Sequence, residues 1–412
     1  MKIYLKKDTL SWILYDFANT IYSMNIVSLY FSQWFIIDLG EKDIVYSIAF
    51  SISLIINGLT MPAIGALCDA RASKHTMLTL FTILCCVSTA LIGIMGNLNP
   101  LLITSIIGLF IIANFAYNAS QALYNALLSS VTTPDNYGRV SGWGVALGYA
   151  GSILGMLAVL PFVKAGGRIS AFLPTGALFL ALSIPAFLFV RDKATPREES
   201  INIGLAYRKV INTLKKTRRY PGLLRFLIAK AFYEDGIATA ILFMAVYAQQ
   251  VMGMSDEVKV PFFIVSTTFA IIGSVVFGYI TDRLGPKKTL IIVITGWVIC
   301  LVFISIIKTT LLFWLIGAVV GIFLGATWTS SRPLLLKLVP AGMEGEAFGL
   351  YSLSGKVAAI IGPLLFGGVV LIAEPLGAVK YRIGVISLAV MMTVGLIILL
   401  GVKEKQILQY KS

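Results

Sequence analysis

Residues 278–288 read GYITDRLGPKK and separate two long apolar runs in the second half of the chain. In the first half, residues 65–74 read GALCDARASK and also separate two apolar runs. A constant shift aligns three pairs of these residues, namely Gly65 with Gly278, Asp69 with Asp282, and Lys74 with Lys287. Self-similarity over this distance predicts that the chain contains two copies of one structural unit.

Glycines support the same repeat. Four of them recur without a gap in the two halves, Gly138, Gly142, Gly148 and Gly155 matching Gly345, Gly349, Gly355 and Gly362. A weaker similarity relates Tyr15-Asp16 to residues 233–235, which read YED. Glycines are common in membrane helices, so coincidence is the alternative, but the matching loops favour parallel repeats that build a pseudo-two-fold transporter.

The composition is typical of a membrane protein. Of the 412 residues, 58% are hydrophobic and 13% are charged, whereas soluble globular chains have about 25% charged residues. A water-soluble fold could not bury so much apolar surface, so the excess is expected to face lipid. The net charge of +14 is then explained by Lys and Arg in cytoplasmic loops, and we expect no nucleic-acid partner.

Cysteine and histidine content argues against metal chemistry. Four cysteines, Cys68, Cys85, Cys86 and Cys300, lie in or beside apolar runs without metal-type spacing, so we interpret them as reduced core residues. The single histidine, His75, lies in a short basic loop and cannot form a multi-histidine site. We therefore expect neither a cofactor nor a metal.

Twelve apolar runs are long enough to cross a bilayer as helices, which needs about 20 residues each. The runs in the first half are Ser11–Ile37, Asp43–Leu67, Thr76–Gly96, Leu101–Ser129, Val140–Val163 and Ala171–Val190. The runs in the second half are Leu223–Met252, Val258–Thr281, Thr289–Ile307, Leu312–Leu338, Ala347–Ile372 and Val379–Val402. The predicted fold class is therefore an all-α membrane protein with twelve transmembrane helices.

A polar, basic stretch separates the two sets of runs. We predict a six-helix bundle at 1–190, a basic linker at 191–222 and a second six-helix bundle at 223–412. An even number of spans places both termini on one side. That side also receives the linker and most of the loop Lys and Arg residues, so we expect it to be the cytoplasmic side of a plasma or inner membrane.

The repeated loop strings resemble the hallmark loop of the major facilitator superfamily. The second copy matches better, because the first lacks the usual glycine after Arg71. More specific strings are WILYDFANT at 12–20, FYEDG at 232–236, FGLYSLSGK at 348–356 and GPLLFG at 362–367. Together they resemble the autophagy-related vacuole effluxer-like family over nearly the whole chain. The resemblance implies two pseudo-symmetric six-helix bundles. Fungal members are implicated in releasing amino acids from the vacuole, which implies an amino-acid-like solute.

Ionisable residues within membrane spans are functional candidates, because burying them in lipid costs several kcal/mol. Asp16, Asp235 and Lys356 could bind a zwitterionic solute, with a carboxylate facing its ammonium group and the lysine facing its carboxylate. The alternative is that Lys356 forms an ion pair with one of these acids. Lys230 and Glu234, four residues apart, could neutralise each other. A buried carboxyl group can also take up a proton, so Asp16, Glu234 and Asp235 are candidates for proton coupling.

Amide side chains form a stripe on the fourth span. Asn114, Asn118, Gln121 and Asn125 are four, three and four residues apart, which places them on one helix face. The stripe could line a hydrated cavity or could supply hydrogen bonds between helices. We favour the cavity, with Asn19 extending its polar lining, and predict solute binding by Asn19, Asn114, Asn118 and Gln121.

Charged residues at the predicted cytoplasmic membrane edge are gating candidates. They are Asp69, Arg71, Arg139, Asp282 and Arg283. Ion pairs among such residues can hold one conformational state and break in the other.

The leading hypothesis is a monomeric secondary transporter, working by alternating access on a small polar solute and using a proton gradient. An exporter of drugs or lipids is the first alternative, although the amides and charges disfavour it. A membrane-embedded enzyme is the second alternative, but we find no Gly-x-Ser-x-Gly elbow, nucleotide loop or histidine cluster. The six-plus-six repeat and the lack of a filter-like loop argue against an ion channel.

Overall fold

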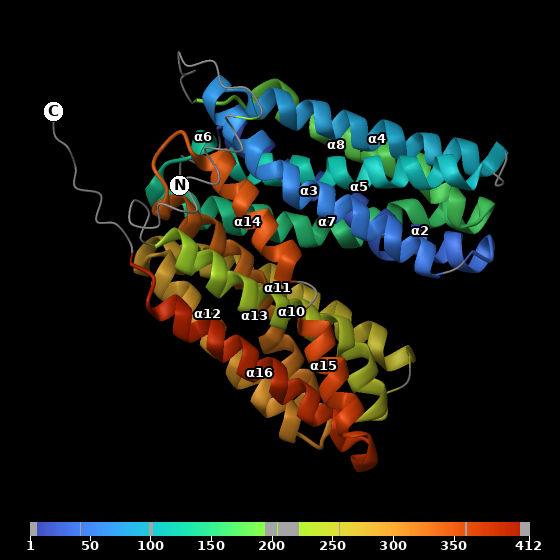
Figure 1. Cartoon of the computed structure of the whole chain (residues 1–412), viewed down its shortest axis with the longest axis vertical. Coiled ribbons are helices and arrows are strands. Elements are labelled where there is room, and N and C mark those ends of the chain that lie inside the picture. Colours follow the sequence, from blue (N-terminus) through green and yellow to red (C-terminus); the bar gives the residue numbers. More distant parts are fainter. Residues whose placement is uncertain are drawn as a thin grey trace. The chain divides into compact units, whose positions relative to one another are not determined.

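Helices account for all regular structure in the described part of the chain. The computed structural model describes residues 6–41, 43–98, 102–193, 204, 222–254, 256–358 and 361–403 (Figure 1). The helices of the first half are α1 (Lys7–Tyr22), η2 (Ser23–Tyr30), α2 (Phe31–Gln33), η3 (Trp34–Asp38), α3 (Asp43–Arg71), α4 (Lys74–Leu98), α5 (Ile103–Ala126), α6 (Leu128–Val131), η4 (Pro134–Asn136), α7 (Tyr137–Gly166), η5 (Arg168–Ala171) and α8 (Phe172–Phe189). Those of the second half are α10 (Leu223–Gln250), α11 (Asp256–Leu284), α12 (Pro286–Ile306), α13 (Thr310–Leu338), α14 (Glu344–Ala358), α15 (Ile361–Ile372), η6 (Glu374–Leu376) and α16 (Val379–Leu400).

Each of the twelve predicted spans coincides with a long helix or with a short series of helices. Within the described residues, nine single helices are long and apolar enough to cross a membrane. The first predicted span, the seventh (α10) and the eleventh are not among these nine. The helical fold follows because a helix pairs its own backbone N–H and C=O groups where lipid offers no partner.

The first and the eleventh predicted spans each contain more than one helical element. The first continues from α1 into the π-helical segments η2 and η3, with the short α2 between them. The wider turns of a π-helix rotate the following side chains relative to those of α1, and such turns are frequent at functional sites. The eleventh predicted span comprises α14 and α15. Both spans contain predicted site residues.

The described residues form two compact units. Unit 1 takes its residues from 1–133, 143–207 and 341–349, and unit 2 takes its residues from 134–142, 208–340 and 350–412. The first turns of α7 and α14 each belong to the unit formed mainly by the other half of the sequence. The division into bundles at 1–190 and 223–412 stays a prediction. Most of the predicted linker at 191–222 lies outside the described residues.

Helix packing follows the same plan in both units. In unit 1, α4 packs on α5 and α8, α1 packs on α8, and α3 packs on α5. In unit 2, the repeat-related helices pair in the same way, so that α12 packs on α13 and α16, α10 packs on α16, and α11 packs on α13. This correspondence supports the internal repeat predicted from the loops and glycines.

The two loops that revealed the repeat each contain a residue with positive φ at the same aligned position. Gly285 precedes α12 with φ of 86°, and Ala72 precedes α4 with φ of 50°. The constant shift aligns these two residues. A left-handed conformation costs an alanine roughly 1–2 kcal/mol and a glycine little. The first copy therefore keeps the positive φ without the glycine that favours it.

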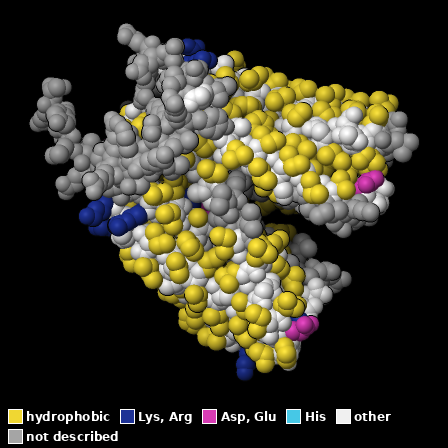
Figure 2. Space-filling model, in the orientation of Figure 1, with side chains coloured by type: hydrophobic (Ala, Val, Ile, Leu, Met, Phe, Trp, Pro, Cys, Tyr) yellow, Lys and Arg dark blue, Asp and Glu magenta, His cyan; other side chains and the backbone are white. Residues whose placement is uncertain are grey.

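The surface of each unit is mostly apolar. Figure 2 shows hydrophobic side chains over most of the visible described surface, with few charged ones. Exposed leucines and isoleucines occur along the long helices, as at Leu59, Leu91, Leu188, Leu242 and Ile397. Patches of this extent are unfavourable in water and match a lipid environment.

Small residues allow α11 and α13 of unit 2 to pack closely. A Cβ atom added at Gly321 would overlap the carbonyl oxygen of Ser266, and one added at Gly325 would overlap that of Ala270. Each bare glycine therefore lets one backbone approach the other directly.

We expect Gly321→Ala to lower the free energy of unfolding by about 1–3 kcal/mol, because the added methyl group must displace backbone. The matched control is Gly108→Ala in α5, where an added Cβ meets nothing within 4 Å. That change should leave stability unchanged or raise it by up to about 1 kcal/mol. Thermal unfolding of the purified variants measures both effects. Equal melting temperatures for the two variants would contradict the close contact.

Candidate functional site

Asp16 lies in the interior of unit 1, within a network of polar side chains. The residue is 3% exposed, and the side-chain amide of Asn19 donates to its Oδ1 at 3.2 Å. Asn19 also exchanges two hydrogen bonds with Gln121 of α5, at 3.3 and 3.0 Å. The Gln121 amide lies 3.4 Å from the Tyr117 hydroxyl. The structure thus brings together three of the predicted solute-binding residues, Asp16, Asn19 and Gln121.

Glycines of α7 make room for the Asp16 carboxylate. A Cβ added at Gly144 would lie 3.3 Å from Asp16 Oδ2, and one added at Gly148 would lie 3.5 Å from Asp16 Cγ. The Thr20 hydroxyl donates to the carbonyl oxygen of Gly148 at 2.7 Å. Gly144 and Gly148, the second of which is a repeat glycine, therefore position α7 directly against the carboxylate.

The amide stripe of α5 makes hydrogen bonds to neighbouring helices. The Asn114 amide, which is buried, donates to the Ser53 hydroxyl of α3 at 2.6 Å. The Asn118 amide donates within α5 to the carbonyl oxygen of Asn114 at 2.7 Å. Gln121 bonds to α1 as described above. Asn114 and Gln121 therefore link α5 to α3 and to α1, and the proposed lining of a hydrated cavity remains a prediction.

Unit 2 contains a buried ion pair on α10. Lys230 is 1% exposed and pairs with Glu234, one helical turn further along. Its ammonium group also donates to the carbonyl oxygen of Tyr351 at 3.1 Å and lies 3.8 Å from the centre of the Tyr351 ring. Gly355 of α14 faces the same ammonium group, since an added Cβ would lie 3.0 Å from it. The predicted mutual neutralisation of Lys230 and Glu234 agrees with this geometry.

Asp235 contacts the start of α15. The residue is 3% exposed; its Oδ2 accepts a hydrogen bond from the Gly362 N–H at 2.6 Å, and its Oδ1 lies 3.5 Å from the Thr239 hydroxyl. This hydrogen bond joins the α10 carboxylate to the backbone of α15 in the interior of unit 2. Asp235 therefore has a structural function beside its predicted one. The side chain of Lys356 lies outside the described residues, so its predicted pairing is not addressed.

Asp69 lies at the end of α3 and binds the first turn of α14, within unit 1. Its two carboxylate oxygens accept hydrogen bonds from the backbone N–H groups of Gly345 and Glu346, at 2.9 and 2.8 Å. The backbones meet at glycine, since a Cβ added at Gly345 would lie 2.6 Å from the Gly65 carbonyl oxygen. Asp69 thus satisfies N–H groups that a helix start leaves without an acceptor.

Lys74 is the basic residue of this cluster, and the sequence interpretation did not include it among the gating residues. Its ammonium group lies 3.0 Å from Asp69, 3.5 Å from Asp192 and 3.2 Å from Glu344. The residue is 1% exposed. The alignment of Lys74 with Lys287 was a signal of its importance, but Asp192 and Glu344 are distant in sequence and nothing linked them to this loop.

Asp282 makes the equivalent contacts in unit 2. Its Oδ1 and Oδ2 accept hydrogen bonds from the N–H groups of Gly138 and Arg139 at the start of α7, at 2.8 and 3.2 Å. The Arg139 side chain pairs with the same carboxylate at 2.8 Å. Arg71 and Arg283, also predicted to gate, are exposed. Lys74 and Arg139 therefore make the ion pairs of the two loop carboxylates.

The described residues show no grouping of three His, Cys, Asp or Glu side chains suited to a metal ion. Cys68, Cys85, Cys86 and Cys300 are buried free thiols. One ring nitrogen of His75 lies 2.9 Å from the carbonyl oxygen of Phe187.

Comparison with known sequences identifies the family. The profile of the family described as "Vacuole effluxer Atg22 like" matches residues 42–137 and 129–409. The chain belongs to this Atg22-like family. A Bacillus subtilis (strain 168) member, called an uncharacterized MFS-type transporter YxiO, is 28% identical over 98% of this chain and 96% of its own length. Autophagy-related protein 22 of Kluyveromyces lactis is 25% identical over 87% of this chain and 74% of its own length.

Solved structures show the fold of this Atg22-like chain. A bacterial homologue of the iron transporter ferroportin, in an outward-facing state, matches with a TM-score of 0.73 at 14% identity over 97% of this chain and 99% of its own. The major facilitator proton:xylose symporter XylE matches with a TM-score of 0.67 at 15% identity over 95% of this chain and 93% of its own. The chain is therefore an integral, multi-pass membrane transporter with the major facilitator fold, and not an enzyme.

We expect Lys74→Met to lower the free energy of unfolding by about 3–5 kcal/mol, because it leaves three buried carboxylates without their cation. The matched control is Arg71→Met, at an exposed position of the same loop. That change should alter stability by no more than about 0.5 kcal/mol. Thermal unfolding of both variants measures the difference. If the two variants have the same melting temperature, the cluster around Lys74 does not stabilise unit 1.

Proposed function

We propose that this Atg22-like transporter is a secondary active transporter that moves a small, amino-acid-like solute by alternating access. The observation that supports this most is the buried network of Asp16, Asn19 and Gln121 in unit 1. A carboxylate and two amides in an apolar bundle are costly, and such groups within membrane spans are usually retained for substrates or ions.

The chemistry of the network suits the ammonium end of a zwitterion. The Asp16 carboxylate supplies negative charge, and the amides of Asn19 and Gln121 supply both donors and acceptors. Asn114 and Asn118 extend the polar face of α5 from the same network. The family description, a vacuole effluxer, agrees with export as the direction.

Unit 2 contributes the second set of groups in this proposal. Asp235 would assist the ammonium end, and Lys356 would bind the solute carboxylate. Asp16, Glu234 and Asp235 are the candidates for taking up a proton during transport. Glu234 forms an ion pair with Lys230. The positive charge of Lys230 could balance the negative charge of Glu234 when Glu234 is not protonated.

The two loop carboxylates are the proposed gating elements. Asp69 holds the first turn of α14, and Asp282 holds the first turn of α7. Breaking these hydrogen bonds would release the helix starts, which is a discrete change of the kind that alternating access needs. Arg139 would stabilise the bound state of Asp282, while Arg71 and Arg283 remain available for pairs in another state.

We also propose that the protein lies in the plasma or inner membrane. Both termini and the linker would then face the cytoplasm. Loops on that side contain most of the Lys and Arg residues, which is the usual bias of cytoplasmic loops.

Cysteine labelling in intact cells checks the orientation. The native cysteines are buried, so background labelling by a membrane-impermeant maleimide should be low. We expect Lys308→Cys, between α12 and α13, to be labelled from outside. Asp135→Cys, before α7, should be labelled only after the membrane is permeabilised. The reverse pattern would overturn the orientation.

Transport assays check the solute site. Amino acids are first screened by thermal shift, because a ligand of the folded state raises the melting temperature by mass action. Uptake of each hit into proteoliposomes is then measured with and without a proton gradient. We expect Asp16→Asn to reduce uptake at least about tenfold, corresponding to the loss of about 1.4 kcal/mol of interaction with the solute.

The matched control for Asp16→Asn is Asp135→Asn, the same chemical change at an exposed position, and it should transport normally. Asp235→Asn and Lys356→Ala are measured in the same uptake assay, and each should also reduce uptake. Normal amino-acid uptake by all of the site variants would overturn the proposed solute site, and the absence of any amino-acid hit would overturn the proposed solute class.

A further inference from the structure

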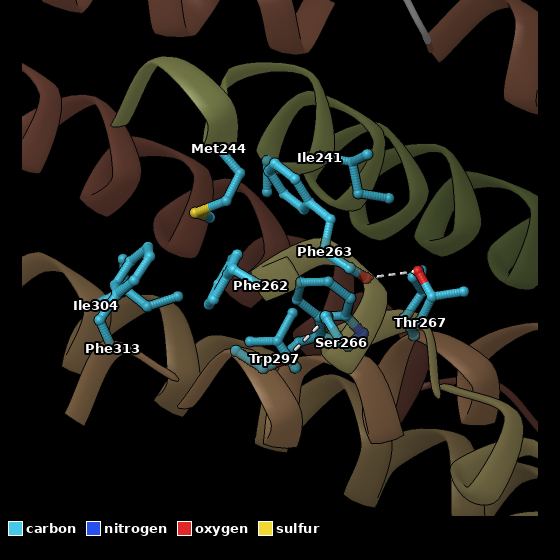
Figure 3. A pocket seen from close by; sticks show the side chains of 13 residues that line it. Ile241, Met244, Phe262, Phe263, Ser266, Thr267, Trp297, Ile304 and Phe313 are labelled. Carbon is cyan, nitrogen blue, oxygen red and sulfur yellow. Dashed lines mark hydrogen bonds between the residues drawn. The ribbon is translucent and has the colours of Figure 1, made fainter. Parts of the chain in front are cut away.

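Unit 2 contains a cavity of about 130 Å³ between α10, α11, α12 and α13. Figure 3 shows the side chains that line it. Among them are Ile241 and Met244 of α10, Phe262 and Phe263 of α11, Trp297 of α12 and Phe313 of α13. The cavity takes no part in the polar network or in the gating contacts.

Stacked aromatic rings form one side of the cavity. Phe262 stacks on Phe313 with ring centres 4.9 Å apart and planes 14° apart, and Tyr247 also stacks on Phe313, with ring centres 6.0 Å apart. Gly317 lies under Phe262, since an added Cβ would overlap the Phe262 ring. The Tyr247 hydroxyl is fixed by the carbonyl oxygen of Ile304 at 2.6 Å. These contacts hold the rings in place before any ligand arrives.

Polar groups at the cavity are already hydrogen-bonded within the protein. The Ser266 hydroxyl donates to Gly317 O at 2.9 Å, and the Thr267 hydroxyl donates to Phe263 O at 2.8 Å. The Trp297 indole N–H donates to the Thr327 hydroxyl at 3.1 Å. None of the described residues that line the cavity is charged. A buried water needs two to four polar partners, so this cavity favours an apolar occupant.

The size of the cavity selects the occupant. A cavity of about 150 Å³ lined by Leu, Ile and Phe remains dry and binds benzene, and the cavity in unit 2 is only slightly smaller. Offset and edge-on contacts with the surrounding rings favour an aromatic guest further, as does the Met244 sulfur. A whole lipid acyl chain would leave most of its length outside. We propose that this cavity is a binding site for one neutral aromatic ring of a small apolar molecule.

This site is separate from Asp235, although both use α10. At 100° per residue, Ala240, Ile241 and Met244 lie about 120–180° around the helix from Asp235. The cavity therefore opens on the opposite side of α10 from the carboxylate, and the inference does not depend on the proposed amino-acid site.

Photolabelling tests the proposal in the full-length protein, reconstituted in lipid nanodiscs. The probe is a phenyl diazirine, which carries one neutral ring, and mass spectrometry maps its attachment sites. We expect saturable labelling at Met244, Phe263 or Trp297. Toluene at ten times its dissociation constant should reduce this labelling about tenfold by mass action. Labelling of Leu242, which is 61% exposed on the same helix, should be non-saturable and insensitive to toluene.

Filling the cavity gives the decisive variant. Ala240 lines the cavity, so Ala240→Leu should abolish the saturable labelling, while Leu242→Ile should leave it intact. If Ala240→Leu fails to fold, Val320→Phe fills the cavity from α13. Unchanged saturable labelling in the filled variant overturns the proposal. Labelling of the same residues by a phospholipid with a diazirine in its acyl chain, displaced by toluene, also overturns it and identifies lipid as the occupant.

Discussion

The structure depends on the pairing of polar groups in a setting without water. Each long helix pairs its own backbone groups, and this allows leucine and isoleucine side chains to cover the outside of both units. A buried polar group that is not paired within its own helix must find a hydrogen-bond partner elsewhere in the protein. The polar contacts described above lie where such partners are needed, at helix starts and between helices.

The two loop carboxylates solve one such problem in the same way. Asp69 and Asp282 each accept two N–H groups from the start of a helix that comes from the other half of the sequence. Glycines make this approach possible, because the backbones meet where no side chain intervenes. The cations differ between the units, since Lys74 balances Asp69 and Arg139 balances Asp282. The repeat therefore preserves the carboxylate contacts more closely than the ion pairs around them.

Candidate solute residues lie beside irregular helical segments or bind helix backbone. Asp16 and Asn19 precede the π-helical segments of the first span, and Asp235 binds the N–H of Gly362 in α15. π-helical turns are frequent at functional sites, which agrees with the proposed role of Asp16 and Asn19 in transport. The apolar cavity of unit 2 illustrates the opposite solution, in which every polar group is satisfied and only apolar surface is left for a ligand.

The sequence by itself determined the membrane setting, the positions of the twelve spans and the repeat, because hydrophobic runs and recurrent glycines are local patterns. It also indicated Asp16, Asn19 and Gln121, since a polar residue in an apolar run is conspicuous. Only the tertiary structure decided which groups meet. Lys74 with Asp192 and Glu344, Lys230 with the Tyr351 carbonyl, and Asp235 with Gly362 join residues distant in sequence. The cavity likewise needs four helices packed together, and no stretch of sequence contains it.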